Sequence, residues 1–267
     1  YEDSGNPLLP AFLFEEAVEE AGNYGRISSY LEPAGDYMSL RVGASFDPTN
    51  EICDNSKDDT GNGLVDCDDP DCEGVMVCRQ EIPGRLDVFV MSECPYGTRA
   101  LDAMEEVLDN FGEEDMEFHV NYIATYVEGT DSFQALHGQS EVDENIRQLC
   151  AIEHYPDDYQ YMDYIWCRNE NIQSSDWEPC AVEAGMETSV IKDCFEGGEG
   201  KELLKENIKL AQQLGVSASP TWLANNQKTF SGITAEAVKT NFCGENTGIT
   251  GCENTLSDTA EIGRAHV

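Results

Sequence analysis

Residues 84–97 read GRLDVFVMSECPYG, and this stretch decides the fold that we expect. The apolar run at 85–91 has the length and composition of a buried strand. Cys94 and Pro95 follow it, and residues 98–112 (TRALDAMEEVLDNFG) have the apolar spacing of a helix that ends at a glycine. A second strand at 116–124 (MEFHVNYIA) completes a βαβ unit, so we expect the cysteine where the first strand passes into the helix.

The rest of the chain up to residue 243 continues this pattern. Residues 140–212 are predicted to be mostly helical, 219–232 (SPTWLANNQKTFSG) to form a hairpin with Asn225 and Asn226 near its turn, and 234–243 to form a last helix. This order is typical of an α/β thioredoxin fold with a helical insertion. Within the insertion, Tyr155, Tyr159, Met162 and Trp166 have helical spacing, and we interpret them as core residues rather than ligand contacts.

Two short motifs carry the candidate chemistry. Cys94-Pro95-Tyr96-Gly97 lies at a predicted helix start, where free N–H groups and the helix dipole favour a thiolate. Ser219-Pro220 directly precedes a predicted strand about 125 residues later. The resemblance to a thioredoxin fold, in which a proline at this position faces the cysteine, implies that these two motifs meet in the folded chain.

Residues 84–243 resemble the DsbA-like branch of thioredoxin-fold proteins, including secreted bacterial and archaeal members. The segments that carry the resemblance are FVMSECPYG (89–97), LHGQSEVDENIRQLC (136–150) and GVSASPTWLANN (215–226). The resemblance implies that Cys94 is the nucleophile, that Gly97 replaces the second cysteine of a C-x-x-C pair, and that Pro220 is cis and faces the thiol. It also implies that the backbone before Pro220, at Ser219, pairs with a substrate chain.

A more distant resemblance is to the gamma-interferon-inducible lysosomal thiol reductase. His137 and Gly138, with Cys150 downstream, are similar to its Cys-Gln-His-Gly signature, although the Cys and the Gln are absent here. We interpret His137 as structural.

A single thiol limits the reactions that are open to the site. Cys94 could attack a disulfide of a protein substrate and form a mixed disulfide with one of its thiols, but release of Cys94 then needs a thiol from the substrate or an external thiol. These properties suit a monothiol oxidoreductase or isomerase. The competing hypothesis is a redox-inactive interaction module that has the same fold.

The cysteines indicate the compartment. The chain has 11 cysteines, which fall by spacing into Cys53, Cys67, Cys72 and Cys78, then Cys150, Cys167, Cys180 and Cys194, then Cys243 with Cys252, and finally Cys94. Local groups of this kind are typical of an oxidising compartment, so we expect a secreted or periplasmic protein in which Cys94 is unpaired.

The charge excludes some classes of partner. With 53 acidic and 15 basic residues the net charge is -38, which repels nucleic acid and anionic bilayers. We interpret the excess acid as a solvated surface. No stretch approaches the ~20 apolar residues of a membrane-spanning helix.

The acidic segment before the thioredoxin-like region is a candidate calcium site. Residues 58–69 read DDTGNGLVDCDD and resemble the calcium repeats of secreted proteins, with Gly63 at the bend. The predicted ligands are Asp58, Thr60, Asn62, the Leu64 carbonyl, Asp66 and Asp69. The alternative is a linker held by disulfides without a specific metal. We expect no organic cofactor.

The termini complete the predicted organisation. Residues 1–46 are expected to be a partial α/β segment, either the end of an upstream thioredoxin-like domain or an extension of the main domain. Residues 47–80 are expected to be the calcium-binding linker, and 244–267 a tail. Residues 261–267 (EIGRAHV) resemble translated sequencing-adapter sequence and are expected to carry no function.

Overall fold

The computed structural model describes residues 8–9, 12–41, 44–45, 50–112, 114–130 and 132–259. It contains two compact units, the first ending at Glu73 and the second beginning at Gly74. The predicted linker, residues 47–80, is therefore divided between them. The predictions for residues 1–7 and 261–267 lie outside the described residues.

The first unit begins with short antiparallel strands. The three-stranded sheet has the order β2 (Leu13–Glu15), β4 (Tyr37–Leu40), β3 (Leu31–Ala34), and β1 (Leu8–Leu9) pairs with β5 (Ala44–Ser45). The acidic stretch between β2 and β3 forms three short 3-10 helices, η2 (Glu16–Glu20), η3 (Tyr24–Arg26) and η4 (Ser28–Tyr30). Because these helices are so short, this unit depends on its turns and strand pairs for its structure.

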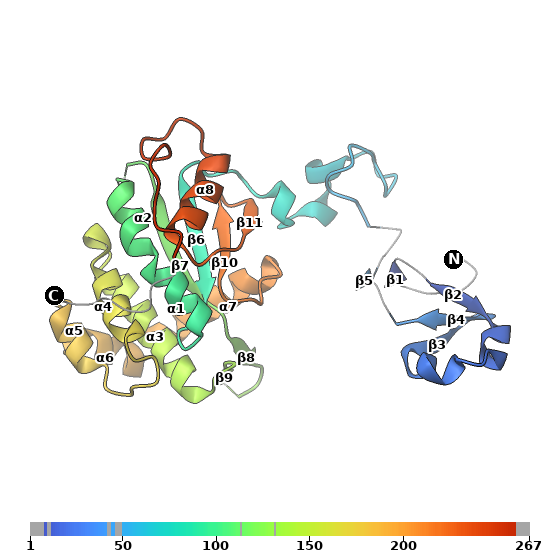
Figure 1. Cartoon of the computed structure of the whole chain (residues 1–267), viewed down its shortest axis with the longest axis horizontal. Coiled ribbons are helices and arrows are strands. Elements are labelled where there is room, and N and C mark those ends of the chain that lie inside the picture. Colours follow the sequence, from blue (N-terminus) through green and yellow to red (C-terminus); the bar gives the residue numbers. More distant parts are fainter. Residues whose placement is uncertain are drawn as a thin grey trace. The chain divides into compact units, whose positions relative to one another are not determined.

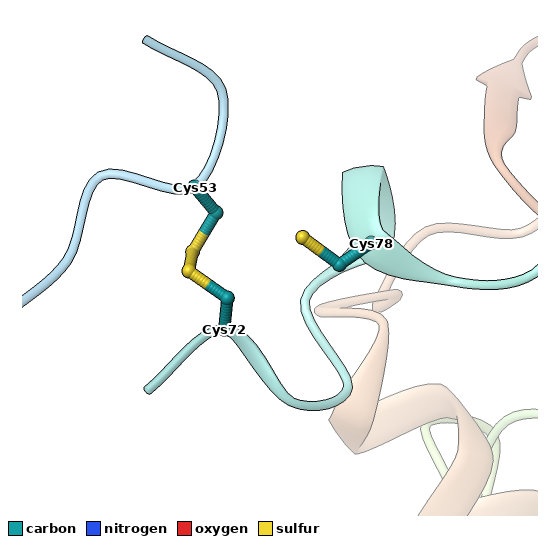
Figure 2. Close-up of side chains that lie close together, drawn as sticks. All are labelled: Cys53, Cys72 and Cys78. Carbon is teal, nitrogen blue, oxygen red and sulfur yellow. A yellow bond between two sulfur atoms is a disulfide. The ribbon is translucent and has the colours of Figure 1, made fainter. Parts of the chain in front are cut away.

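The acidic segment that ends this unit is held by covalent bonds and side-chain hydrogen bonds. Its regular structure is two single 3-10 turns, η5 (Asp66–Asp68) and η6 (Pro70–Cys72). A disulfide joins Cys53 to Cys72, as Figure 2 shows. Cys67 is also disulfide-bonded. The prediction that disulfides support this apolar-poor segment is thus confirmed.

The second unit is built on a four-stranded sheet with the order β11-β10-β6-β7 (Figure 1). β6 (Arg85–Val90) runs parallel to β7 (Glu117–Tyr122), which is the predicted βαβ unit. β10 (Thr221–Ala224) pairs with β6 in antiparallel orientation and forms a hairpin with β11 (Lys228–Phe230). Asn225 and Asn226 form its turn at φ 50° and 65°, a left-handed conformation that asparagine tolerates.

Helices cover both faces of this sheet. The helices described in this unit are α1 (Pro95–Asp102), α2 (Met104–Asn110), α3 (Gln139–His154), α4 (Gln160–Asn169), α5 (Glu178–Glu183), α6 (Thr188–Gly197), α7 (Glu199–Gln213) and α8 (Ala235–Glu245). Of these, α5 and α6 pack on other helices rather than on the sheet. Leu86, Val88 and Val90 of β6 point into the larger core, whereas Phe89 packs with Ala211 and Leu214 at the end of α7. Both faces of β6 are therefore buried, which explains why its sequence is apolar almost without interruption.

The structure of the second unit differs from the sequence prediction at the helix after Cys94 and in the segment after β7. The helix predicted at 98–112 begins earlier, at Pro95, and is divided at Ala103 into α1 and α2. A small hairpin of β8 (Thr125–Val127) and β9 (Ser132–Gln134) was not predicted. Two single 3-10 turns, η7 (Met76–Cys78) and η8 (Asp157–Tyr159), complete the second unit.

The four residues interpreted as core do pack on it, but they do not share one helix. Met162 is fully buried, and Tyr155, Tyr159 and Trp166 pack against the same core. Tyr155 ends α3, and Tyr159 precedes α4 in a left-handed conformation. The apolar spacing therefore predicted burial correctly but joined two helices across a turn.

The domain continues past residue 243. A disulfide joins Cys243 to Cys252, and Leu256 packs against the core. The N–H of Leu256 donates to Glu236 Oε2 at 2.7 Å, and the N–H of Ser257 donates to Glu106. The first part of the predicted tail is thus a strap that is fixed to α2 and α8.

Candidate functional site

Cys94 lies between the central strand and the first helix of the larger unit. It is the N-cap residue of α1, directly before Pro95, whose fixed φ and missing N–H suit the first position of a helix. The Cys94 N–H donates to the Met91 carbonyl at 3.0 Å, and the Cys94 carbonyl accepts from the Thr98 N–H at 2.9 Å. The other ten cysteines are disulfide-bonded, so this half-buried sulfur is the free thiol of the chain.

The Ser219-Pro220 motif meets the thiol. The Ser219–Pro220 peptide bond is cis, and the carbonyl oxygen of Ser219 lies 3.7 Å from Cys94 Sγ. The Ser219 hydroxyl accepts a hydrogen bond from the Met91 N–H at 3.0 Å. The expected meeting of two motifs 125 residues apart is therefore present.

Position 97 has no room for a side chain. A Cβ atom built on Gly97 would lie 2.5 Å from Ser219 Oγ, 3.1 Å from the Met91 carbonyl and 3.3 Å from Val90 Cβ. The Ser219 hydroxyl thus occupies space that a second cysteine at 97 would need. Real Cβ atoms essentially never approach other heavy atoms to 2.5 Å, so a cysteine here requires its neighbours to move.

Tyr96 is the exposed aromatic residue of the motif. Its side chain is 58% exposed, and the Arg99 guanidinium lies 5.8 Å from the centre of its ring. An exposed aromatic ring two residues from the thiol can contact an extended chain that approaches Cys94.

The sequence prediction did not include the polar residues of α3 that hold the segment before the thiol. The Ser92 N–H donates to Asn145 Oδ1 at 3.2 Å, and the Glu93 N–H donates to Glu141 Oε2 at 3.2 Å. Glu141 and Asn145 are fully buried. A usable signal was present, because these polar residues lie one turn apart on the side of a helix that also carries buried apolar residues.

A second buried polar network joins α3 to α4. The Arg168 side chain donates to Glu144 Oε1 at 2.9 Å and to the Ser174 and Asp176 carbonyls, and both partners of the ion pair are about 95% buried. Tyr122 and Tyr164 lie beside this pair, and burial raises the pKa of both hydroxyls. The network ties the helical insertion to β7.

The predicted calcium ligands come together only in part. Asp69 Oδ2 accepts hydrogen bonds from Thr60 Oγ1 at 3.1 Å and from Asn62 Nδ2 at 2.8 Å, and Thr60 Oγ1 also lies 3.5 Å from Asp58 Oδ1. Asp66 instead accepts from the N–H groups of Asn55 and Ser56. Its carboxylate has no hydrogen bond to the other predicted ligands in the described part of the chain.

Backbone N–H groups donate hydrogen bonds to several carboxylates of this acidic segment. Asp58 accepts from Gly61 at 2.6 Å and from Gly63 at 2.9 Å. Glu51, which the sequence prediction omitted, accepts from the N–H groups of Asp59, Thr60 and Asp66 and is 7% exposed. Within the described residues, no three of these carboxylates have oxygens within 4.8 Å of one another. Of the six predicted ligands, Asp58, Thr60, Asn62 and Asp69 are linked by hydrogen bonds between their side chains.

Among the described residues, no helix is both long and apolar enough to cross a membrane. Cys194 lies near His154 and Glu199, a combination that could resemble a metal site. Because Cys194 is bonded to Cys150, its sulfur is not available as a thiolate ligand.

Two family models match the larger unit. Residues 85–184 match the model of the gamma interferon inducible lysosomal thiol reductase, and residues 159–240 match the DSBA-like thioredoxin domain. The two matches overlap and together run from β6 into α8. No curated protein matches the chain in sequence.

Solved structures with a similar backbone have low sequence identity to this chain. The thiol-disulfide exchange protein alpha-DsbA2 from Wolbachia pipientis is 12% identical, with 59% of this chain and 79% of that chain covered and a TM-score of 0.45. Oxidised BdbD from Bacillus subtilis is 15% identical, with coverages of 60% and 86% and a TM-score of 0.40. A periplasmic thioredoxin-like protein from Salmonella enterica serovar Typhimurium is 14% identical, with coverages of 62% and 88% and a TM-score of 0.44.

The strand order, the helical insertion and the two family models agree with one another. The resemblance identified in the sequence is confirmed by the matches to both models. The larger unit of this chain therefore has an α/β thioredoxin fold with a helical insertion, and it is similar to the DSBA-like thioredoxin domain.

Proposed function

We propose that this chain is an extracytoplasmic thiol-disulfide oxidoreductase or isomerase that uses the single thiol of Cys94 to form mixed disulfides with protein substrates. The observation that carries the proposal is the packing of Gly97 against Ser219. Cys94 faces the Ser219 carbonyl, and a resolving cysteine at position 97 would have to displace the Ser219 hydroxyl. Monothiol exchange is the chemistry that this arrangement favours.

The reaction conserves atoms and electrons in two exchanges. The Cys94 thiolate attacks one sulfur of a substrate disulfide, so that a Cys94–substrate disulfide forms, the substrate disulfide breaks, and the released substrate thiolate takes up a proton. A second thiol of the substrate then attacks the mixed disulfide and releases the Cys94 thiolate. The substrate has then exchanged one disulfide for another without net oxidation. If two external thiols act in turn instead, the first attacks the Cys94 sulfur and releases the substrate as a dithiol, and the second frees Cys94, so that the substrate is reduced and the two external thiols leave as a disulfide.

Three features support the proposed reaction. The thiol is partly exposed at the start of an eight-residue helix, where a substrate disulfide can reach it. The Ser219 carbonyl beside it belongs to the backbone that can pair with an extended substrate chain. Ten disulfide-bonded cysteines suit an oxidising compartment such as a periplasm or the exterior of a cell.

The test uses the full chain with its disulfides intact. The wild-type protein should restore activity to a scrambled, disulfide-containing ribonuclease when a small thiol is present, and Cys94→Ser should not. The exposed variant Tyr96→Ala serves as a second probe, because it should weaken turnover without removing it. If the wild type and Cys94→Ser restore activity equally, the domain is the redox-inactive interaction module of the competing hypothesis.

We also propose that the acidic segment of the first unit binds Ca²⁺. Asp58, Thr60, Asn62 and Asp69 lie within hydrogen-bond reach of one another and offer only oxygen ligands if the Asn62 amide turns. Asp66 and the Leu64 carbonyl would have to join them. A bound calcium ion would cross-link a segment that has few apolar residues to bury.

Calorimetry with calcium chloride on the full chain tests this second proposal. The wild type should give saturable heat, which Asp69→Asn should weaken at least tenfold. Asp68→Asn is the matched control, because Asp68 is exposed and has the same charge one residue away. Equal calcium affinity in the two variants, or no saturable heat at millimolar calcium in the wild type, would refute the proposed calcium site.

A further inference from the structure

The first two turns of α3 hold the residues that lead into the thiol. Beyond the bonds of Ser92 and Glu93 to Asn145 and Glu141, the Ser92 hydroxyl lies 3.4 Å from the Glu141 carbonyl. Three hydrogen bonds thus join residues 92 and 93 to one face of α3. Cys94 is the next residue along the chain, so these bonds fix the direction from which its sulfur emerges.

Glu141 and His137 form a pair at this point. Glu141 Oε2 accepts from the Glu93 N–H and lies 2.5 Å from His137 Nδ1, and Glu141 Oε1 accepts from the His137 N–H at 3.3 Å. Gly138, between them, has a φ of 103°, which a residue with a side chain rarely adopts. This glycine allows the chain to turn so that His137 lies over the carboxylate four residues later.

Packing alone does not explain these polar residues. Glu141 is fully buried, and a buried carboxylate is costly unless it is bonded to partners. Asn145 is also fully buried, and its Nδ2 has no hydrogen-bond partner among the described residues. An unpaired buried donor costs about 1–3 kcal/mol. Both residues nevertheless bond to the two residues that precede the thiol.

The helix that carries them is itself well anchored. Cys150 of α3 is disulfide-bonded to Cys194 of α6. A Cβ on Gly200 of α7 would lie 2.5 Å from Ile146 Cγ2 and 2.8 Å from Cys150 Sγ, so α3 and α7 are in close contact. A rigid support of this kind is what an oriented reactive group requires.

We propose that Glu141, with His137 as its partner, is a positioning residue that fixes Cys94 for attack through the N–H of Glu93. This role rests on the proposed function, because it concerns the same thiol. Glu141 acts through Glu93 and does not itself touch the reacting sulfur. His137, interpreted from the sequence as structural, is then part of the support of the site.

The rate of Cys94 alkylation by iodoacetamide in the folded chain measures this role. Glu141→Ala should lower the second-order rate constant about tenfold, within the roughly hundredfold that a displacement of about 1 Å can cost. Glu141→Gln keeps an oxygen that can accept from the Glu93 N–H, so its rate should stay within about twofold of the wild type. His137→Ala should slow alkylation by a factor of about three, since it removes one of two partners.

Glu153→Ala is the matched control, because Glu153 is an exposed acid on the same helix. Its rate should equal that of the wild type. If Glu141→Ala unfolds at a lower urea concentration but alkylates at the wild-type rate, Glu141 is merely structural and the proposal is overturned. If Glu141→Ala does not fold, His137→Ala decides, and a wild-type rate in that variant overturns the proposal.

Alkylation uses no disulfide substrate. A chain that fails to reshuffle ribonuclease but shows the expected rates with iodoacetamide would therefore refute the proposed function and leave the positioning role intact. The reverse result would refute only the positioning role.

Discussion

Replacing Gly97 by alanine adds a single methyl group at the position where a C-x-x-C enzyme has its second cysteine. The new Cβ would meet Ser219 Oγ at 2.5 Å and the Met91 carbonyl at 3.1 Å. The Ser219 side chain can rotate away, but it then loses its hydrogen bond from the Met91 N–H. The backbone carbonyl of Met91 cannot move without disturbing the end of β6.

The magnitude follows from these contacts. Overpacking a closed site costs about 1–3 kcal/mol, and the lost hydrogen bond adds about 1 kcal/mol. Alanine is favoured over glycine within a helix by about 1 kcal/mol, which offsets part of the loss. We expect Gly97→Ala to lower the free energy of unfolding by about 2 kcal/mol.

A double-mutant cycle isolates the contact with Ser219. Ser219→Ala alone should cost about 1 kcal/mol through its lost hydrogen bond, but it also removes the atom that the new Cβ would strike. The double variant should therefore be more stable than the two single effects predict, by about 1 kcal/mol. Urea denaturation of the oxidised chain measures all four proteins.

Gly244 provides the control, because it lies in α8 and a Cβ added there would have no neighbouring atom within 4 Å. Gly244→Ala should be neutral or slightly stabilising. If the Gly97 and Ser219 effects add to within about 0.5 kcal/mol, Ser219 does not fill the place of a second thiol. The packing of Ser219 against Gly97 would then give no support to the proposed monothiol reaction.

Two further predictions concern the stability of the domain. Arg168→Ala leaves Glu144 buried without its ion-pair partner and should lower the free energy of unfolding by about 3–5 kcal/mol. Replacing the exposed Lys192 by alanine should change the free energy of unfolding little. Equal urea midpoints for the two variants would contradict this prediction. The hydrogen bond from Lys239 lowers the pKa of Glu236, so the stability that Glu236 contributes is present above about pH 4.3 and is lost as the pH falls. Glu236→Gln should therefore lose more stability at pH 7 than in acid in urea titrations, unlike the exposed Glu245→Gln, and a loss that does not depend on pH would refute the assignment.

Local signals in the sequence predicted most of the larger fold. The apolar strand before Cys94, the proline after it and the Asn225-Asn226 turn each specify their own backbone, and each is found where expected. The disulfides Cys53–Cys72, Cys167–Cys180 and Cys243–Cys252 stay within the groups that spacing indicated. A disulfide needs its two cysteines close together in space, and cysteines that are close in the sequence meet this condition more easily. The spacing of the cysteines therefore predicted the groups but not the pairs.

Features set by tertiary contacts could not be predicted in the same way. Glu141 and Asn145 lie on the apolar side of their helix, but the sequence does not show that their partners are the N–H groups of residues 92 and 93, which only the fold brings against α3. Likewise, the closed space at Gly97 depends on Ser219, which is far away in the sequence. In the acidic segment, Asp66 matches a ligand position of the motif but bonds to Asn55 and Ser56 instead, because backbone N–H groups from outside the motif compete for it.

Mixed-disulfide formation with oxidised glutathione tests the nucleophilic role of Cys94 most directly. Intact mass and peptide mapping of the folded chain should show one glutathione, attached to Cys94 and absent from Cys94→Ser, and it should form faster than on an unstructured peptide spanning residues 91–97. If the folded chain gains no glutathione, or gains it no faster than the peptide, the claim that the fold makes Cys94 reactive in disulfide exchange is contradicted.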